Sequence, residues 1–373
     1  MKASRYSVTL NLLIGSTLVA AGCGDSGLTA DTAGAAETVV AAAQDCAGAP
    51  ALRASGSTAQ QNAIEQFVFA FVRACPGRTL AYEANGSAAG VEDFLANQTD
   101  LAGSDLALDP ARDQPERAAT RCGSPAWHLP VVFNPIAISY HLPGVSSLTL
   151  DAPTAAKIFN GTVSTWDNAA IKALNPGVAL PAAAIHVIYH SDRSGSTAAL
   201  QRYLDDASDG VWTGGAGETF NGSGDEGASG DDGAVAALQD TGGSITYSLW
   251  SAAQGRQLQM ARIVTAADRA PVAISTDSVG KALARATFAA PGNDLVLDSV
   301  SLHKPSDAGA YPVVLATYEI VCSKYPDPQI GAAVKAFLRA ALDAGQDGLD
   351  QYGAVPLPEP VKSRLLGAVR DVS

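Results

Sequence analysis

Three turns of small hydroxyl residues and glycine are the clearest candidates for chemistry in this sequence of 373 residues: residues 55–59, 85–90 and 190–197. Each follows a short apolar run and precedes a helical pattern, which predicts a strand–turn–helix unit. Backbone N–H groups at a helix N-terminus lack intrahelical partners, and the helix dipole is positive there, so such turns bind anions. Glycine permits close backbone approach, and hydroxyls add donors.

Each turn alone has another explanation, because serine and threonine are ordinary N-caps. Three turns at equivalent places favour a shared anion site. The first turn lacks the lysine and the spacing of a P-loop, so the pattern does not indicate a nucleotide site.

Asp105 narrows the identity of the anion. It stands at the end of a further predicted strand, in the segment 100–105. A carboxylate repels a neighbouring anion unless that anion carries a proton to donate. Phosphate carries such a proton at neutral pH and sulfate does not, so Asp105 would discriminate against sulfate. The alternative is that Asp105 only caps the next helix.

The elements that must position these turns alternate between strands and helices. Ile64, Phe67 and Phe71 recur at helical spacing, and residues 130–140 form a long apolar run rich in β-branched side chains. This alternation predicts an α/β fold with largely parallel sheets. Residues 214–233 are rich in Gly, Asp and Ser, which predicts a surface loop whose acids are solvated and do not match a calcium loop.

The N-terminus predicts export. Lys2 and Arg5 precede an apolar stretch, residues 8–21, that is shorter than the roughly 20 residues of a membrane span. Residues 1–22 are therefore predicted as a signal peptide. Ala20, Ala21 and Gly22 before Cys23 resemble a lipobox, although Leu18 stands two places further from the cysteine than the usual leucine. We expect lipidation of Cys23, with ordinary secretion as the alternative, and a flexible tether over 23–45.

The remaining cysteines number four and allow three pairings. Exported proteins keep disulfides, and no CxxC spacing indicates zinc. Cys46 and Cys75 each precede a short apolar run. If these runs are neighbouring parallel strands, their starts lie side by side, so we expect Cys46–Cys75 and, by elimination, Cys122–Cys322.

Charge and length limit the partners. The formal net charge is −13, and Lys2 and Arg5 lie in the leader, so the mature chain is still more acidic. Such a chain is a poor candidate for nucleic acid or an anionic membrane surface, and it must capture an anion by local hydrogen bonds. About 350 residues after the leader suggest two lobes.

Together these motifs resemble the PstS phosphate-binding proteins of phosphate ABC importers, particularly the actinobacterial lipoprotein forms. The resemblance runs from about Cys46 to the C-terminus and rests on the order and spacing of several segments: 54–60, 84–90, 103–105, 157–161 with Trp166, 174–176, 190–197 and 243–247.

This resemblance implies a two-lobe, periplasmic-binding-protein-like (type II) α/β fold whose hinge is crossed twice, near 134–139 and 313–317. Lobe one then comprises 46–136 plus 315–373, and lobe two comprises 137–314. It further implies a monomer without enzymatic activity, cofactor or metal. Its partners would be inorganic phosphate, the membrane through Cys23, and permease subunits. The matching phosphate-binding positions are Ser57, Thr58, Ala59, Ser87, Asp105, Ser194, Gly195 and Ser196.

Two positions depart from the family pattern. His190 stands where an arginine usually binds the ligand and the nearby aspartate, and Ser196 stands where threonine is usual. Arg193, in the same turn, would supply the missing charge from another position. We hypothesise that His190 makes binding pH-dependent, since imidazole titrates near neutrality and Asp192 would stabilise its charged form. Alternatively, His190 only ends the strand.

Two other functions remain open from the sequence. A phosphatase would use one of the turn serines as nucleophile, which requires an activating base or a metal, and the sequence offers His190 but no metal-ligand cluster. A phosphate sensor or surface protein would use the same binding fold without transport.

Overall fold

The computed structural model describes residues 46–373. The predicted signal peptide, the lipidation of Cys23 and the tether lie outside this part of the chain. None of the helices in residues 46–373 combines the length and the hydropathy that a membrane span requires.

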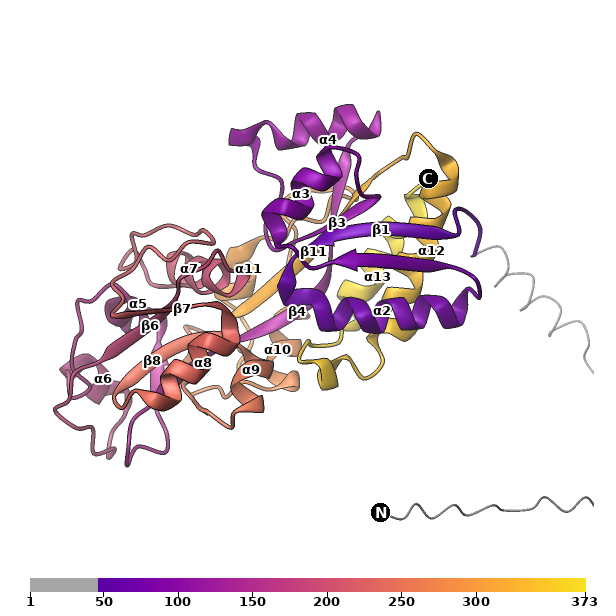
Figure 1. The fold of residues 1–373 in the computed structure, drawn as a ribbon. Coiled ribbons are helices and arrows are strands. Elements are labelled where there is room, and N and C mark those ends of the chain that lie inside the picture. Colours follow the sequence, from indigo (N-terminus) through magenta and orange to yellow (C-terminus); the bar gives the residue numbers. More distant parts are fainter. Residues whose placement is uncertain (1–45) are drawn as a thin grey trace, which may run out of the picture. The chain divides into compact units, whose positions relative to one another are not determined.

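A nine-stranded sheet runs through the described part of the chain in the order β2-β1-β3-β11-β4-β8-β6-β7, with β9 paired to β4 (Figure 1). Its strands are β1 (Ala51–Gly56), β2 (Thr79–Glu83), β3 (Leu101–Ser104), β4 (Ala126–His141), β6 (His186–His190), β7 (Glu226–Ala228), β8 (Ser244–Leu249), β9 (Gln259–Met260) and β11 (Val314–Cys322). A separate parallel pair joins β5 (Thr149–Asp151) to β10 (Arg262–Val264).

The two ends of the large sheet are parallel, but its centre is not. β1 pairs in parallel with β2 and β3, and β6 pairs in parallel with β7 and β8. β11 is antiparallel to β3 and β4, and β4 is antiparallel to β8. The prediction of largely parallel sheets is therefore wrong for the centre, because the late strand β11 inserts between β3 and β4.

Helices cover the two ends of the sheet separately (Figure 1). Beside β1–β3 lie α2 (Gln61–Ala74), α3 (Ser87–Leu95), α4 (Gln114–Cys122), α12 (Pro328–Leu342) and α13 (Glu359–Asp371). The other helices are α5 (Ala152–Phe159), α6 (Ala169–Leu174), α7 (Gly195–Ala207), α8 (Gly230–Asp240), α9 (Trp250–Gly255), α10 (Thr276–Leu283) and α11 (Ser299–His303). Short 3-10 turns span Thr58–Gln60, Pro110–Arg112, Ala344–Gln346 and Leu349–Tyr352.

The predicted helical spacing is realised in α2. Its buried face contains Ile64, Phe67 and Phe71, and the Phe71 ring meets Phe337 of α12 edge to face at 5.7 Å. Burial of such side chains contributes about 1.5–3 kcal/mol each. This packing fixes α2 against the sheet, and with it the turn that precedes α2.

Both expected disulfides are present, Cys46–Cys75 and Cys122–Cys322. The first joins the segments that lead into β1 and β2, which are parallel neighbours as the pairing argument required. The second joins the end of α4 to the end of β11, across 200 residues of sequence.

Residues 214–233 are not wholly a solvated loop, which corrects the expectation from composition. They contain β7 and the first turn of α8. The Asp225 carboxylate accepts a hydrogen bond from the Val187 N–H at 2.8 Å, and Asp231 has buried partners described below.

Candidate functional site

The candidate site centres on the buried carboxyl group of Asp105, just after β3. Its Oδ2 accepts hydrogen bonds from the hydroxyls of Ser57 at 2.9 Å and Ser87 at 3.1 Å. Its Oδ1 accepts from the Thr317 hydroxyl at 2.7 Å. The first two turns, the acid and the late strand β11 therefore meet at one point.

Close backbone approach joins the first turn to β3. Gly56, with φ of +144°, ends β1, and a Cβ at this position would lie 1.9 Å from the Gly103 carbonyl oxygen. Ser57 then caps the 3-10 turn ahead of α2, since its hydroxyl accepts from the Ala59 N–H at 3.1 Å. α3 begins at Ser87. The strand–turn–helix prediction is confirmed at both turns, although the Thr58 side chain is exposed.

The third turn reaches the same carboxyl group. Ser194 caps α7 by accepting from the Ser196 N–H, and Gly195 is the first helical residue. A Cβ at Gly195 would lie 2.2 Å from Asp105 Oδ2. The N-terminus of α7 therefore lies directly against Asp105, and only glycine allows this approach.

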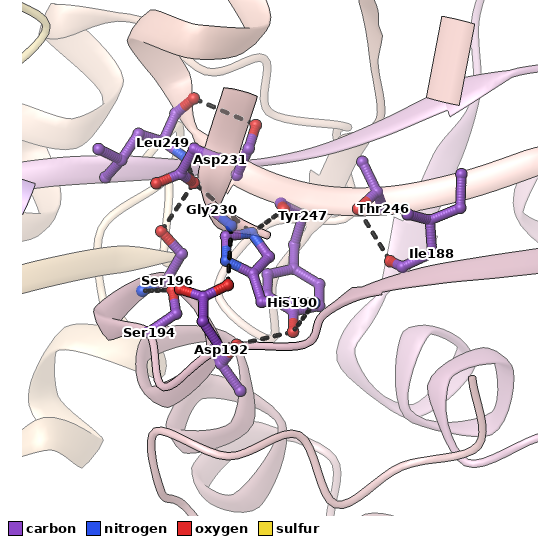
Figure 2. A network of polar contacts seen from close by, with 12 residues as sticks. Ile188, His190, Asp192, Ser194, Ser196, Gly230, Asp231, Thr246, Tyr247 and Leu249 are labelled. Carbon is purple, nitrogen blue, oxygen red and sulfur yellow. Dashed lines mark hydrogen bonds and ion pairs between the residues drawn. The ribbon is translucent and has the colours of Figure 1, made fainter. Parts of the chain in front are cut away.

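His190 lies behind the third turn, fully buried (Figure 2). Its ring stacks on Tyr247 at 5.0 Å between centroids, and its Nε2 lies 3.2 Å from the Tyr247 carbonyl oxygen and 3.7 Å from Asp231 Oδ1. Its Nδ1 has no hydrogen-bond partner within the described residues. The acid that pairs with His190 is therefore Asp231. Asp192 accepts from the Gly230 N–H, and its expected effect on His190 stays a prediction.

Asp231 links His190 to the third turn. Its Oδ1 accepts from the Ser196 hydroxyl at 2.9 Å and from the Leu249 N–H at 2.7 Å (Figure 2). Burial raises the pKa of Asp231, and the nearby His190 opposes that rise. Protonation of Asp231 would weaken it as the acceptor of the Ser196 hydroxyl.

Arg193 is engaged by Glu218. Its Nε donates to Glu218 Oε2 at 3.0 Å, while the side chain remains 56% exposed. In this structure Arg193 therefore supplies its charge to Glu218 and not to Asp105.

Burial raises the pKa of Asp105 from 3.8 to about 6, although the hydroxyls of Thr317, Ser57 and Ser87 act to lower it. The negative charge of Glu218 adds to the rise. A carboxylate in this setting is a strong acceptor for any additional proton donor, because it is shielded from water.

Two cavities border the Asp105 segment. One of about 370 Å³ is lined by Ser87, Arg193 and Glu218, among others, and one of about 240 Å³ is lined by Asp105 and residues of α7 and β11. Leu106 and Ala107 line both cavities. Of these two cavities, the second is the one that Asp105 itself lines. Among residues 46–373, no group of three His, Cys, Asp or Glu side chains could hold a metal ion.

The residues that sequence reasoning missed are Thr317, Asp231, Glu218 and Tyr247. Thr317 lies in β11 and meets Asp105 across 212 positions of sequence. Tyr247 lies within a segment of the family resemblance, but its contacts with His190 and, at 2.7 Å, with the Thr197 hydroxyl show its place in the site. No local signal indicates the other three.

The fold places this site in a broad class of binding proteins. A family model described as a PBP superfamily domain matches residues 30–343. The structure resembles a high-affinity periplasmic phosphate-binding protein solved with phosphate bound, with a TM-score of 0.64, 22% identity, and coverage of 85% of this chain and 93% of that one. A human phosphate-binding apolipoprotein gives a TM-score of 0.65 at 20% identity, with the same coverage.

Sequence relatives narrow the class. The phosphate-binding protein PstS2 of Mycobacterium bovis is 55% identical over 373 residues, and PstS 3 of Mycobacterium leprae is 54% identical over 374 residues, each covering 100% of both chains. The chain belongs to the PstS family of phosphate-binding proteins within the PBP superfamily. The predicted family and α/β binding-protein fold are confirmed.

The raised pKa of Asp105 leads to a stability prediction. A carboxyl group whose pKa is higher in the folded than in the unfolded state contributes stability below about pH 3.8, and this contribution is lost as the pH rises to about 6. Asp105→Asn should therefore raise the free energy of unfolding of the anion-free protein at pH 7.5 by up to about 3 kcal/mol, and not at pH 3.5. Urea titration at the two pH values measures this.

Asp151→Asn is the matched control, because Asp151 is a partly buried acid of another element, where it caps α5 by accepting from the Thr154 N–H. Asp151→Asn should not raise the free energy of unfolding at pH 7.5. An Asp105→Asn protein less stable than the wild type at pH 7.5 would contradict the assigned burial cost.

Proposed function

We propose that the protein binds inorganic phosphate outside the cytoplasm and delivers it to the permease subunits of an ABC importer. The observation that carries this proposal is the buried Asp105 carboxyl group, surrounded by hydroxyl donors and faced by the N-terminus of α7. Relatives more than 50% identical over their full length bear the name phosphate-binding protein PstS, which supports it.

In this proposal, Asp105 accepts a proton from the bound phosphate, which turns a repulsive charge into a charge-assisted hydrogen bond. The Ser57 and Ser87 hydroxyls, with Thr58 and Ala59, supply donors from one side. Ser194, Gly195 and Ser196 supply donors from the other side, where the positive end of the α7 dipole adds to them. Sulfate lacks this proton, so the buried Asp105 carboxylate would repel it.

We also propose the two lobes expected from the family, 46–136 plus 315–373 and 137–314, with β4 and β11 as the hinge crossings. β4 supports this, since it pairs with β11 along its first part and with β8 along its second. One segment assigned to lobe two, near Asp294, lies against the lobe-one end of β4, where Asp294 Oδ1 bonds His128 Nδ1 at 2.7 Å.

Location and assembly remain proposals as well. The leader pattern supports export and anchoring by a lipid on Cys23 to the outer face of the cell membrane, and we propose that the protein is a monomer. A phosphate sensor or surface protein without transport would use the same site and remains the second candidate.

A phosphatase is less well supported. An activated serine needs a base on its hydroxyl. The base that the sequence offers is His190, and its Nε2 faces the Tyr247 carbonyl oxygen instead of a turn serine. The curated relatives are named as binding proteins, and the absence of catalysis in this chain is our proposal.

Titration calorimetry tests the function. The protein used starts after Cys23 and is first stripped of bound anion. We expect one phosphate per chain at pH 7 and no heat with sulfate. Asp105→Asn should weaken phosphate binding by about 10- to 100-fold, the effect of losing a charged hydrogen bond of about 1.5–3 kcal/mol, and should narrow the gap to sulfate.

Asp151→Asn serves again as the control and should bind phosphate as the wild type does. Equal heats for sulfate and phosphate in the wild type would contradict the role of Asp105, and an absence of phosphate binding would contradict the proposed function itself.

A second prediction concerns His190. Because Asp231 and the stacked Tyr247 hold this imidazole behind the third turn, its protonation should strengthen binding of the anion. The ratio of phosphate Kd in His190→Gln to that in the wild type should fall as the pH rises from 5.5 to 8. The ionisation of the ligand and of Asp105 affects both proteins alike and so cancels. A flat ratio would refute this role and leave Arg193, released from Glu218, as the cation of the site.

A further inference from the structure

Glu319 is a buried acid that the site described above does not use. It lies in β11, opposite Gly103 of β3, and is completely inaccessible to solvent. Neither of its carboxyl oxygens has a hydrogen-bond partner within residues 46–373. A buried charge without a partner costs several kcal/mol, so this position requires a physical explanation.

The space above Gly103 contains the groups that face Glu319. A Cβ at Gly103 would lie 2.0 Å from Gln60 Nε2 and 2.7 Å from Tyr82 Oη. Residues directly opposite each other in an antiparallel pair project to the same face. The Glu319 carboxyl group therefore lies on the face occupied by the Gln60 amide and the Tyr82 phenol.

These two side chains lead to the first turn of the anion site. Gln60 Nε2 donates to Tyr82 Oη at 3.0 Å, and Tyr82 Oη donates to the carbonyl oxygen of Ser57 at 2.7 Å. The hydroxyl of the same Ser57 donates to Asp105. Two hydrogen bonds thus join the Gln60 amide to the backbone of Ser57, whose side chain contacts the centre of the site.

The buried oxygens near the start of this path lack a hydrogen-bond donor, and one proton on Glu319 would supply it. Gln60 Oε1 is buried without a partner, like both oxygens of Glu319. Acceptors cannot satisfy one another, but a protonated Glu319 has an O–H to donate. One proton would thus satisfy two buried groups.

The electrostatic surroundings agree with a protonated acid. Burial raises the pKa of Glu319 from 4.5 to about 7, and hydrogen bonding by the Gln60 side chain acts to lower it. The titratable groups that sense the Glu319 charge are the buried phenols of Tyr82 and Tyr325, and Asp105 also acts on Tyr82. His128 of β4 pairs with Ile320, the next residue along β11, and so lies on the opposite face of the sheet.

We propose that Glu319 is a positioning residue of the anion site: it holds a proton, donates it to Gln60 Oε1, and through Tyr82 fixes the Ser57 carbonyl and the first turn. The inference rests on the proposed function for its ligand. Loss of the proton would break the donation to Gln60, loosen the turn and weaken phosphate binding as the pH rises.

Three variants test the path by phosphate calorimetry between pH 6 and 8.5. Glu319→Gln keeps a donor that cannot ionise. The ratio of its Kd to that of the wild type should be near one at pH 6 and should fall about 3- to 10-fold by pH 8.5, the worth of one hydrogen bond. Tyr82→Phe should weaken binding about 3- to 10-fold at pH 6.

Tyr325→Phe is the matched control. Its hydroxyl also donates to a backbone carbonyl, that of Asp100, at 2.8 Å, but not to a turn of the site. It should lower the melting temperature about as much as Tyr82→Phe does and leave the phosphate Kd unchanged. Equal effects of the two tyrosine variants on Kd would show a merely structural role and overturn the inference.

Infrared spectroscopy tests the proton without any ligand. The carbonyl band of a protonated carboxylic acid should be present in the wild type at pH 6 and should decline towards pH 8.5. The part of this band that belongs to Glu319 should be missing from the spectrum of Glu319→Gln at pH 6. If the Glu319 part of the band is absent at pH 6, the inference is overturned. If it is present but no phosphate binds, the proposed function is wrong, while the protonation of Glu319 is confirmed.

Discussion

The structure depends on the burial of one carboxyl group among hydroxyl donors. Asp105 is surrounded by Ser57, Ser87 and Thr317, which come from three different strands or turns, and by the N-terminus of α7. Burial makes its charge costly, and the hydroxyls only partly offset that cost. The same cost makes the site selective, because a ligand that donates a proton relieves it and a ligand without one does not.

The antiparallel centre of the sheet makes this arrangement possible. β11 returns from the far end of the chain to lie between β3 and β4, and it brings both Thr317 and Glu319 to the first turn. Gly56, Gly103 and Gly195 keep the space around these polar groups free of side chains. In our account, the strand that serves as a hinge crossing also supports the binding site, so opening of the lobes and release of the anion would be coupled.

Local patterns predicted the three turns, because hydroxyl and glycine residues before an amphipathic helix are typical of helix N-termini. The structure adds that Ser57 and Ser194 are the capping residues. The Cys46–Cys75 pairing followed from neighbouring parallel strands. Thr317 and Asp231 could not be predicted, since their roles depend on contacts between distant segments. The start of α8 lacked apolar spacing, so composition alone indicated a loop there.

The most direct test of the central claim is a neutron diffraction structure of the deuterated protein with phosphate at pH 7. We predict a deuteron on a phosphate oxygen that donates to Asp105, with Ser57, Ser87 and the first turn of α7 donating to the same anion. A phosphate bound without contact to Asp105, or a deuteron held by Asp105 and donated to the anion, would contradict the account.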